Sequence, residues 1–115
     1  MPTNPPAVSD ADARAKIADL TGWSVESGWL RRTYKTGGWP TTLMLVNAIG
    51  FVAEAADHHP DLLVKWGSVQ VGLQTHTAGG ITEKDLELAR VIEATASWRP
   101  GDGSALDGTA GKWVE

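Results

Sequence analysis

The sequence predicts an α+β domain in which a four-stranded antiparallel sheet carries helices on one face. Strand patterns occur in two hairpin pairs, and a helical pattern precedes, separates and follows them, so that the order is α-β-β-α-β-β-α. Strands joined as hairpins are antiparallel, and in such domains the helices gather on one side of the sheet. A length of 115 residues fits a single domain with one hydrophobic core.

The N-terminal segment predicts one short helix. Residues 1–8 are rich in proline and form an irregular lead. Ser9 and Asp12 have the spacing of a capping box, which predicts a helix from there to about Leu20. Thr21-Gly22 ends this helix, whose inward face consists of Ala13, Ile17 and Leu20.

The first hairpin is expected at residues 23–26 and 29–35, with a turn at Ser27-Gly28. The second joins Leu62–Trp66 to Ser68–Thr75. In its last strand the apolar residues point inward, and Ser68, Gln70, Gly72 and Gln74 point outward. We expect Trp66 in the core and a solvated strand face at Arg31, Arg32 and Lys35.

A long helix is expected from Pro40 to Ala56, because proline suits the first turn of a helix. Apolar residues cover most of its circumference, which is typical of a helix that is buried on more than one side. Since one sheet covers only one side, a second subunit is a plausible cover for the rest. The capping box of Thr82 and Asp85 opens a last helix to about Trp98.

Residues 99–115 carry no periodicity and are rich in Gly, Asp and Ser. We expect an irregular tail, for which Trp113 is the natural anchor. The predicted division is therefore a lead at residues 1–8, a domain at residues 9–98 and a tail at residues 99–115.

The composition favours a soluble cytoplasmic protein. The net charge of −4 gives no electrostatic reason to expect nucleic acid or an anionic membrane as a partner. The absence of cysteine excludes disulfides and thiol chemistry and fits a reducing cytosol. The first residues do not resemble a signal peptide, and no apolar run approaches the roughly 20 residues that span a bilayer.

All three histidines lie within 19 residues, at His58, His59 and His76. Histidine exchanges protons near neutral pH, so this concentration indicates a site. Adjacent side chains point in different directions, which suits two edges of a small ligand better than one metal ion. Two alternatives remain open: ordinary surface or core histidines, and a zinc site of His58, His76 and a carboxylate, although no recognised ligand spacing is present.

Several neighbours could orient these imidazoles. Glu54 lies four residues before His58, which brings the two together if the helix extends that far. Asp85 is explained by its capping position alone. Pro60 favours an extended His59 and ends the helix there.

The combined spacing resembles the signature of the pterin-4a-carbinolamine dehydratases. Its elements are Glu54-x3-His58-His59-Pro60, Trp66, His76 and Asp85, together with Gly22-Trp23 and residues 78–89. The resemblance covers about residues 9–98. It departs from the family at Thr77, where many members carry an acidic residue.

This resemblance implies a hydro-lyase that needs no cofactor and converts 4a-hydroxytetrahydropterin to quinonoid dihydropterin plus water, in tetrahydrobiopterin recycling. His58 and His76 would be the catalytic acid and base, and His59 would complete the catalytic set by binding and orienting the pterin. The pocket would be lined by His58, His59, Pro60, Thr75, His76, Thr77 and Ala78. Glu54, Asp57 or Asp85 would orient an imidazole.

The resemblance also implies a homodimer or homotetramer with a pterin as its small-molecule substrate. Neither nucleic acid nor a membrane is expected as a direct partner. The alternative is a non-catalytic relative that acts as a dimerisation or assembly factor for another protein.

Overall fold

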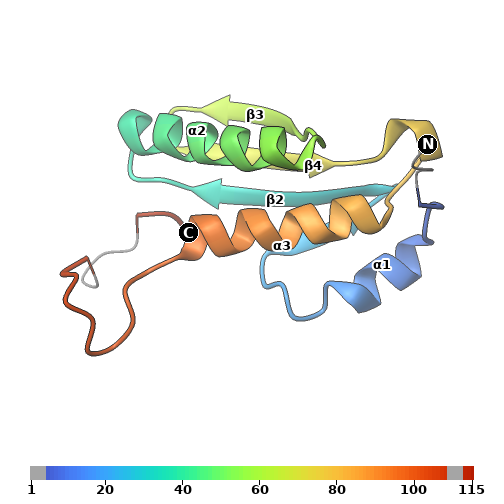
Figure 1. Ribbon diagram of the computed structural model, residues 1–115. Coiled ribbons are helices and arrows are strands. Elements are labelled where there is room, and N and C mark those ends of the chain that lie inside the picture. Colours follow the sequence, from blue (N-terminus) through green and yellow to red (C-terminus); the bar gives the residue numbers. More distant parts are fainter. Residues whose placement is uncertain (1–4, 109–112) are drawn as a thin grey trace.

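The computed structural model describes residues 5–108 and 113–115 (Figure 1). Its elements follow the predicted order, with one short 3₁₀ helix added before the last α-helix. They are α1 (Asp10–Lys16), β1 (Trp23–Glu26), β2 (Trp29–Lys35), α2 (Trp39–Ala56), β3 (Asp61–Lys65), β4 (Ser68–Leu73), η1 (His76–Ala78) and α3 (Glu83–Ser97).

The strands form one sheet in the order β1-β2-β4-β3, in which every neighbouring pair is antiparallel. Helix α2 contacts β3, β4 and α3, and α3 also contacts β2 (Figure 1). The predicted α+β fold is confirmed. The core lies between the sheet and the two long helices, and its fully buried side chains include Leu30, Tyr34, Val69, Val71, Leu73, Ile49 and Ile92.

A polar network is built into this core around Glu93 of α3. Its Oε1 accepts hydrogen bonds from Trp23 Nε1 and Tyr34 Oη, both at 2.8 Å, and from Arg32 Nε at 3.3 Å. Arg32 also stacks on the Tyr34 ring at 4.2 Å. The expectation of a solvated Arg32 is therefore wrong, because strand alternation places it on the core face with Tyr34. Burial first, and then the bond to Glu93, raise the pKa of Tyr34 above its usual range.

Two element ends fall short of the sequence-based expectation by two residues or more, whereas the start of α2 and both ends of β3 differ from it by one residue. Helix α1 ends at Lys16 and not near Leu20, because the chain turns at Ile17, where Leu20 N donates to Ile17 O at 2.8 Å. Strand β4 ends at Leu73, and Thr75 forms an isolated bridge with Gly80 instead of continuing the strand.

Trp66 is 70% exposed at the β3–β4 turn, so the expectation that it is a core residue is wrong. Its indole lies beside Gly38, which precedes α2: a Cβ atom built on Gly38 would be 3.4 Å from Trp66 Cζ2. A tight turn between two strands leaves a large side chain at its tip no interior to enter.

The tail returns to the sheet at its end. Strand β1 pairs with β2 only as far as Arg32, so the following edge of β2 is open. There Thr36 bridges Val114, and Glu115 N donates to Lys35 O at 2.8 Å. Trp113 is exposed, so the tail is held by its backbone and not by that indole.

Candidate active site

Three elements bring the predicted site residues to one end of the molecule (Figure 1). Helix α2 and strand β4 both end there, and α3 begins there. His58 follows α2, His76 follows β4, and Asp85 lies in the first turn of α3. Residues separated by 27 positions in the sequence thus come into contact because the hairpin returns the chain to its starting end.

The end of α2 turns His58 towards the interior. Asp57 adopts the left-handed conformation, with φ 51° and ψ 40°, and His58 N donates to Ala53 O at 3.1 Å. This is the closure typical of a helix C-terminus, and aspartate is one of the residues that tolerate it. The chain reverses there, and the His58 side chain is only 14% exposed.

A fully buried carboxylate holds His58. Asp85 Oδ1 lies 2.5 Å from His58 Nε2, while Oδ2 accepts from Thr82 N at 2.9 Å and from Thr75 Oγ1 at 2.8 Å. An ionised carboxylate only accepts hydrogen bonds, so Nε2 carries the proton of this bond. The neutral imidazole then keeps its lone pair on Nδ1, where it can take up a proton.

His59 makes a different kind of contact. Its Nε2 lies 2.7 Å from Glu54 Oε1, and both side chains are exposed. Glu54 thus bonds to His59 and not to His58, because α2 ends at Ala56 and the helical spacing does not extend to His58. An exposed pair of this kind contributes little to stability.

His76 opens η1 and is exposed, with its ring in edge-to-face contact with Trp29. The ring centroids are 6.1 Å apart and the planes are inclined by 77°. Trp29 was not foreseen as a site residue, because its contact arises from the pairing of β2 with β4. Gly72 makes room for it: a Cβ atom there would lie 3.4 Å from Trp29 Cε3 and 3.2 Å from Arg31 Nη1. Gly72, which we expected to point outward, is therefore covered by the side chains of Trp29 and Arg31 and is buried.

The loop of residues 75–80 links His76 to the buried carboxylate. Thr75 N donates to Gly80 O at 2.9 Å, and the Thr75 hydroxyl contacts both Asp85 Oδ2 and Thr82 Oγ1 at 2.8 Å. The sequence indicated Thr75 only as a lining residue, whereas its buried hydroxyl joins the two histidine-bearing segments. Of the other expected lining residues, Thr77 is exposed and Pro60 and Ala78 are half-buried.

The remaining expectations are placed as follows. Asp57 forms the helix C-cap described above, and Trp66 lies at the other end of α2, about 27 Å away by the rise of an 18-residue helix. In the part of the chain that the structure describes, no group of three or more His, Asp or Glu side chains is arranged to hold a metal ion. Among the same residues, no helix is long and apolar enough to cross a membrane.

Comparison with known proteins identifies the family of this chain. Residues 6–95 match the family model described as pterin 4 alpha carbinolamine dehydratase. The chain belongs to this family. A relative from Roseiflexus sp. (strain RS-1), provisionally named pterin-4-alpha-carbinolamine dehydratase, is 41% identical over 86 residues, which cover 75% of this chain and 92% of the relative.

Two solved structures share the fold. The transcriptional coactivator/pterin dehydratase from Brucella melitensis has a TM-score of 0.73 and 27% identity, and the match covers 79% of this chain and 99% of that one. A pterin dehydratase-like RuBisCO assembly factor of the alpha-carboxysome has a TM-score of 0.54 and 20% identity, with 65% and 87% covered. The second likeness concerns the fold alone.

Proposed function

We propose that this protein is a 4a-hydroxytetrahydropterin dehydratase, a hydro-lyase that forms quinonoid dihydropterin and water in tetrahydrobiopterin recycling. Membership of the family supports the substrate class. The observation that carries the proposal is the pair of His58 and buried Asp85, which fixes one imidazole tautomer beside the segment that bears His76. We place the reaction in the cytoplasm, with which the cysteine-free sequence is compatible.

The reaction breaks one C–O bond and one N–H bond. An acid donates a proton to the 4a-oxygen, which leaves as water, while a base removes a ring N–H proton and its electron pair forms the new C=N bond. We assign the acid and base to His58 and His76, with Nδ1 of His58 as its reacting atom. Each such group accelerates a reaction by about 10²–10⁴-fold.

The remaining site residues bind and orient the substrate. His59 is exposed at the rim, where its ring can meet one edge of a pterin, and Glu54 restrains it. Pro60, Thr77 and Ala78 flank the histidines, and the backbone of Thr75 closes the loop. Asp85 is a positioning residue that acts through His58.

The rate of 4a-hydroxytetrahydropterin dehydration, followed by ultraviolet absorbance, tests this assignment. We expect wild type to accelerate it over buffer, and His58→Ala and His76→Ala each to lower the rate about tenfold or more. Val91→Ala is the matched control, because Val91 lies on α3, the helix that carries Asp85, but is 47% exposed. Folded wild-type protein that gives no acceleration would contradict the proposal.

A second role, the binding of another protein, is favoured by the outer face of α2. Leu43 and Phe51 are exposed there, whereas soluble helices normally turn such residues inward. A second copy in a homodimer or homotetramer would cover them, as would a partner protein of the kind implied by the name of the Brucella coactivator. If partner binding is the function, His58→Ala combined with His76→Ala should leave it intact, while Phe51→Glu should weaken it.

A further inference from the structure

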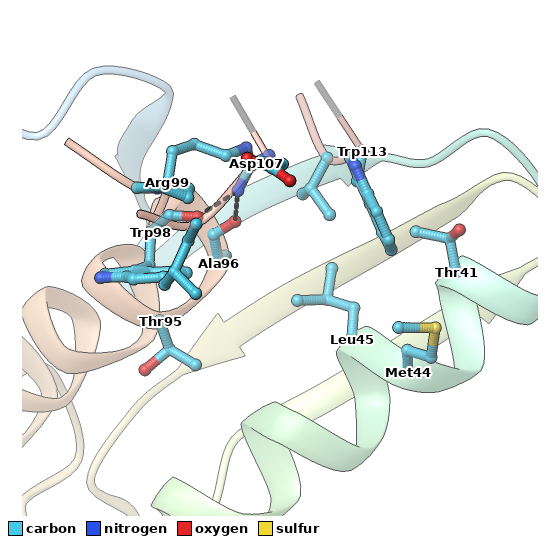
Figure 2. Close-up of a pocket in the computed structure, with 13 residues that line it drawn as sticks. Thr41, Met44, Leu45, Thr95, Ala96, Trp98, Arg99, Asp107 and Trp113 are labelled. Atoms are coloured by element: carbon cyan, nitrogen blue, oxygen red, sulfur yellow. Dashed lines mark hydrogen bonds between the residues drawn. The ribbon is translucent and has the colours of Figure 1, made fainter. Parts of the chain in front are cut away.

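A second candidate site lies at the opposite end of the molecule from the histidines. An open cavity of about 460 Å³ lies between the start of α2, the end of α3 and the tail (Figure 2). Its volume falls within the roughly 300–1,000 Å³ that is typical of small-molecule sites. Most of its lining lies outside the residues that match the family model, which end at residue 95.

The walls of this cavity are mainly apolar and include two indoles. Figure 2 shows Trp113 reaching from the tail towards Met44 and Leu45 of α2, with Trp98 on the far side of the space. Met44, Trp98, Trp113 and also Leu106 of the tail are each more than half exposed. A molecule in the cavity would cover apolar surface of these side chains, and the removal of such surface from water is the main driving force for binding at apolar sites.

The polar groups at the rim are few. Arg99 uses Nη1 to donate to Trp98 O at 2.6 Å and to Ala96 O at 3.4 Å, so it caps the end of α3 (Figure 2). Asp107 and the Thr41 side chain also line the rim. A few polar groups around an apolar interior suit a molecule with an apolar body and one polar substituent.

The shape of the cavity argues against a helix of a second copy as its occupant. A sphere of 460 Å³ is about 10 Å across, and a helix with its side chains is itself about 10–12 Å wide. The tail forms one wall of the space and is fixed to β2, because Val114 forms a bridge with Thr36 and Glu115 N donates to Lys35 O at 2.8 Å.

We infer that this cavity binds a small planar aromatic molecule. Indole rings attract other aromatic rings through edge-to-face and offset stacking, and the methionine sulfur at Met44 interacts favourably with ring edges. This inference is independent of the proposed dehydratase activity, since none of the residues that line the cavity belongs to the histidine site.

Nuclear magnetic resonance of the indole N–H groups in the full chain, titrated with 2-naphthol, tests the inference. We expect saturable shifts of the Trp98 and Trp113 signals. The signals of Trp23, which is bonded to Glu93, and of Trp66, which is exposed outside the cavity, should stay in place. Shifts of Trp66 equal to those of Trp113 would indicate adsorption to any exposed indole and would overturn the inference, as would the absence of saturation.

Two variants and one matched probe complete the test. Trp113→Ala should weaken 2-naphthol binding about fivefold, whereas Val91→Ala, on the same helix as Thr95 but outside the cavity, should leave it unchanged. The saturated analogue decahydro-2-naphthol should bind about threefold or more weakly. Equal affinity for both probes would overturn the aromatic class. Trp98 and Trp113 signals that move on dilution of the protein alone would assign the cavity to a contact between copies.

Discussion

The two ends of this protein are built in opposite ways. At the histidine end, polar side chains from α2, the β4 loop and α3 meet in short hydrogen bonds around a fully buried carboxylate. At the tail end, large apolar side chains stay exposed around a cavity, and the tail is held by backbone bonds to β2. The hydrogen bonds at the histidine end fix the positions of individual atoms, whereas the cavity at the tail end offers space for a ligand. Acid–base chemistry needs the former, and binding of an apolar molecule needs only the latter.

The two ends are connected through the core network of Glu93. Arg32 donates to Glu93 with Nε and to Glu115 O with Nη1, at 3.3 and 3.2 Å. The tail is therefore bonded to β2, the strand that also carries Trp29. The Trp29 ring in turn contacts His76. Substitutions at the histidine end and at the tail end can show whether the dehydration rate and 2-naphthol binding change independently.

The largest effect is expected for Asp85→Asn. An amide cannot accept from His58 on one side and from both Thr75 and Thr82 on the other, so the tautomer of His58 is no longer fixed. We expect the dehydration rate to fall about 10²-fold, and the free energy of unfolding to fall by about 1–3 kcal/mol.

The exposed counterpart, Glu54→Gln, is the matched control for Asp85→Asn. Because Glu54 and His59 are in solvent, its effect on the rate should be less than about threefold. Dehydration kinetics, urea unfolding and the ¹⁵N shifts of the His58 ring measure these differences. Equal effects of the two substitutions would contradict the distinction between a buried and a rim pair.

A second prediction concerns the pH dependence of the free energy of unfolding. Its measurement also tests whether the two ends unfold together. Since burial and Glu93 raise the pKa of Tyr34, the unfolded chain releases this proton at lower pH than the folded one. The contribution of Tyr34 to the free energy of unfolding is therefore complete below about pH 10. Above that pH it falls by about 1.4 kcal/mol per pH unit. Tyr34→Phe should remove this slope.

Urea unfolding at several alkaline pH values measures the slope. Tyr34 is the only tyrosine, so tyrosinate absorbance reports it alone. Indole signals from the tail end and imidazole signals from the histidine end should show one transition. Two separate transitions would mean that the ends are independent folding units.

A smaller effect is expected for Trp29→Ala, which removes the ring that contacts His76. An aromatic contact contributes about 0.5–1.5 kcal/mol, so the dehydration rate should fall about threefold to tenfold. Binding of 2-naphthol at the other end should not change. Trp66→Ala, which removes an exposed indole far from His76, provides the control and should leave the rate unaltered. A wild-type rate in Trp29→Ala would show that the contact does not position His76.

The smallest effect is expected for Glu115→Pro, which removes the N–H group that donates to Lys35 O. The free energy of unfolding should fall by about 1 kcal/mol or less. The dehydration rate should stay the same while 2-naphthol binding weakens. Glu115→Ala keeps the N–H group and should match wild type in all three measurements. A lower dehydration rate in the proline variant would show that the two ends are coupled.

The sequence by itself determined the order of elements, the inward apolar face of β4 and the position of the histidines on a helix end and a strand end. These features depend on local periods of 2 and 3.6 residues and on capping and turn residues, which short segments display without their partners. The capping box of Thr82 and Asp85 was visible in this way and is present. The predicted catalytic roles, and the division of the chain into a lead, a domain and a tail, stay predictions.

Only the tertiary structure decided which of these residues meet. The bond of Asp85 to His58, the burial of Arg32 beside Glu93 and the contact of Trp29 with His76 join residues that are 27, 61 and 47 positions apart. Such contacts follow from the pairing of strands, from the left-handed turn at Asp57 and from the room left by Gly72, none of which has a local periodic signal. The cavity at the tail end is of the same kind, because it exists only where the returning tail closes over α2 and α3.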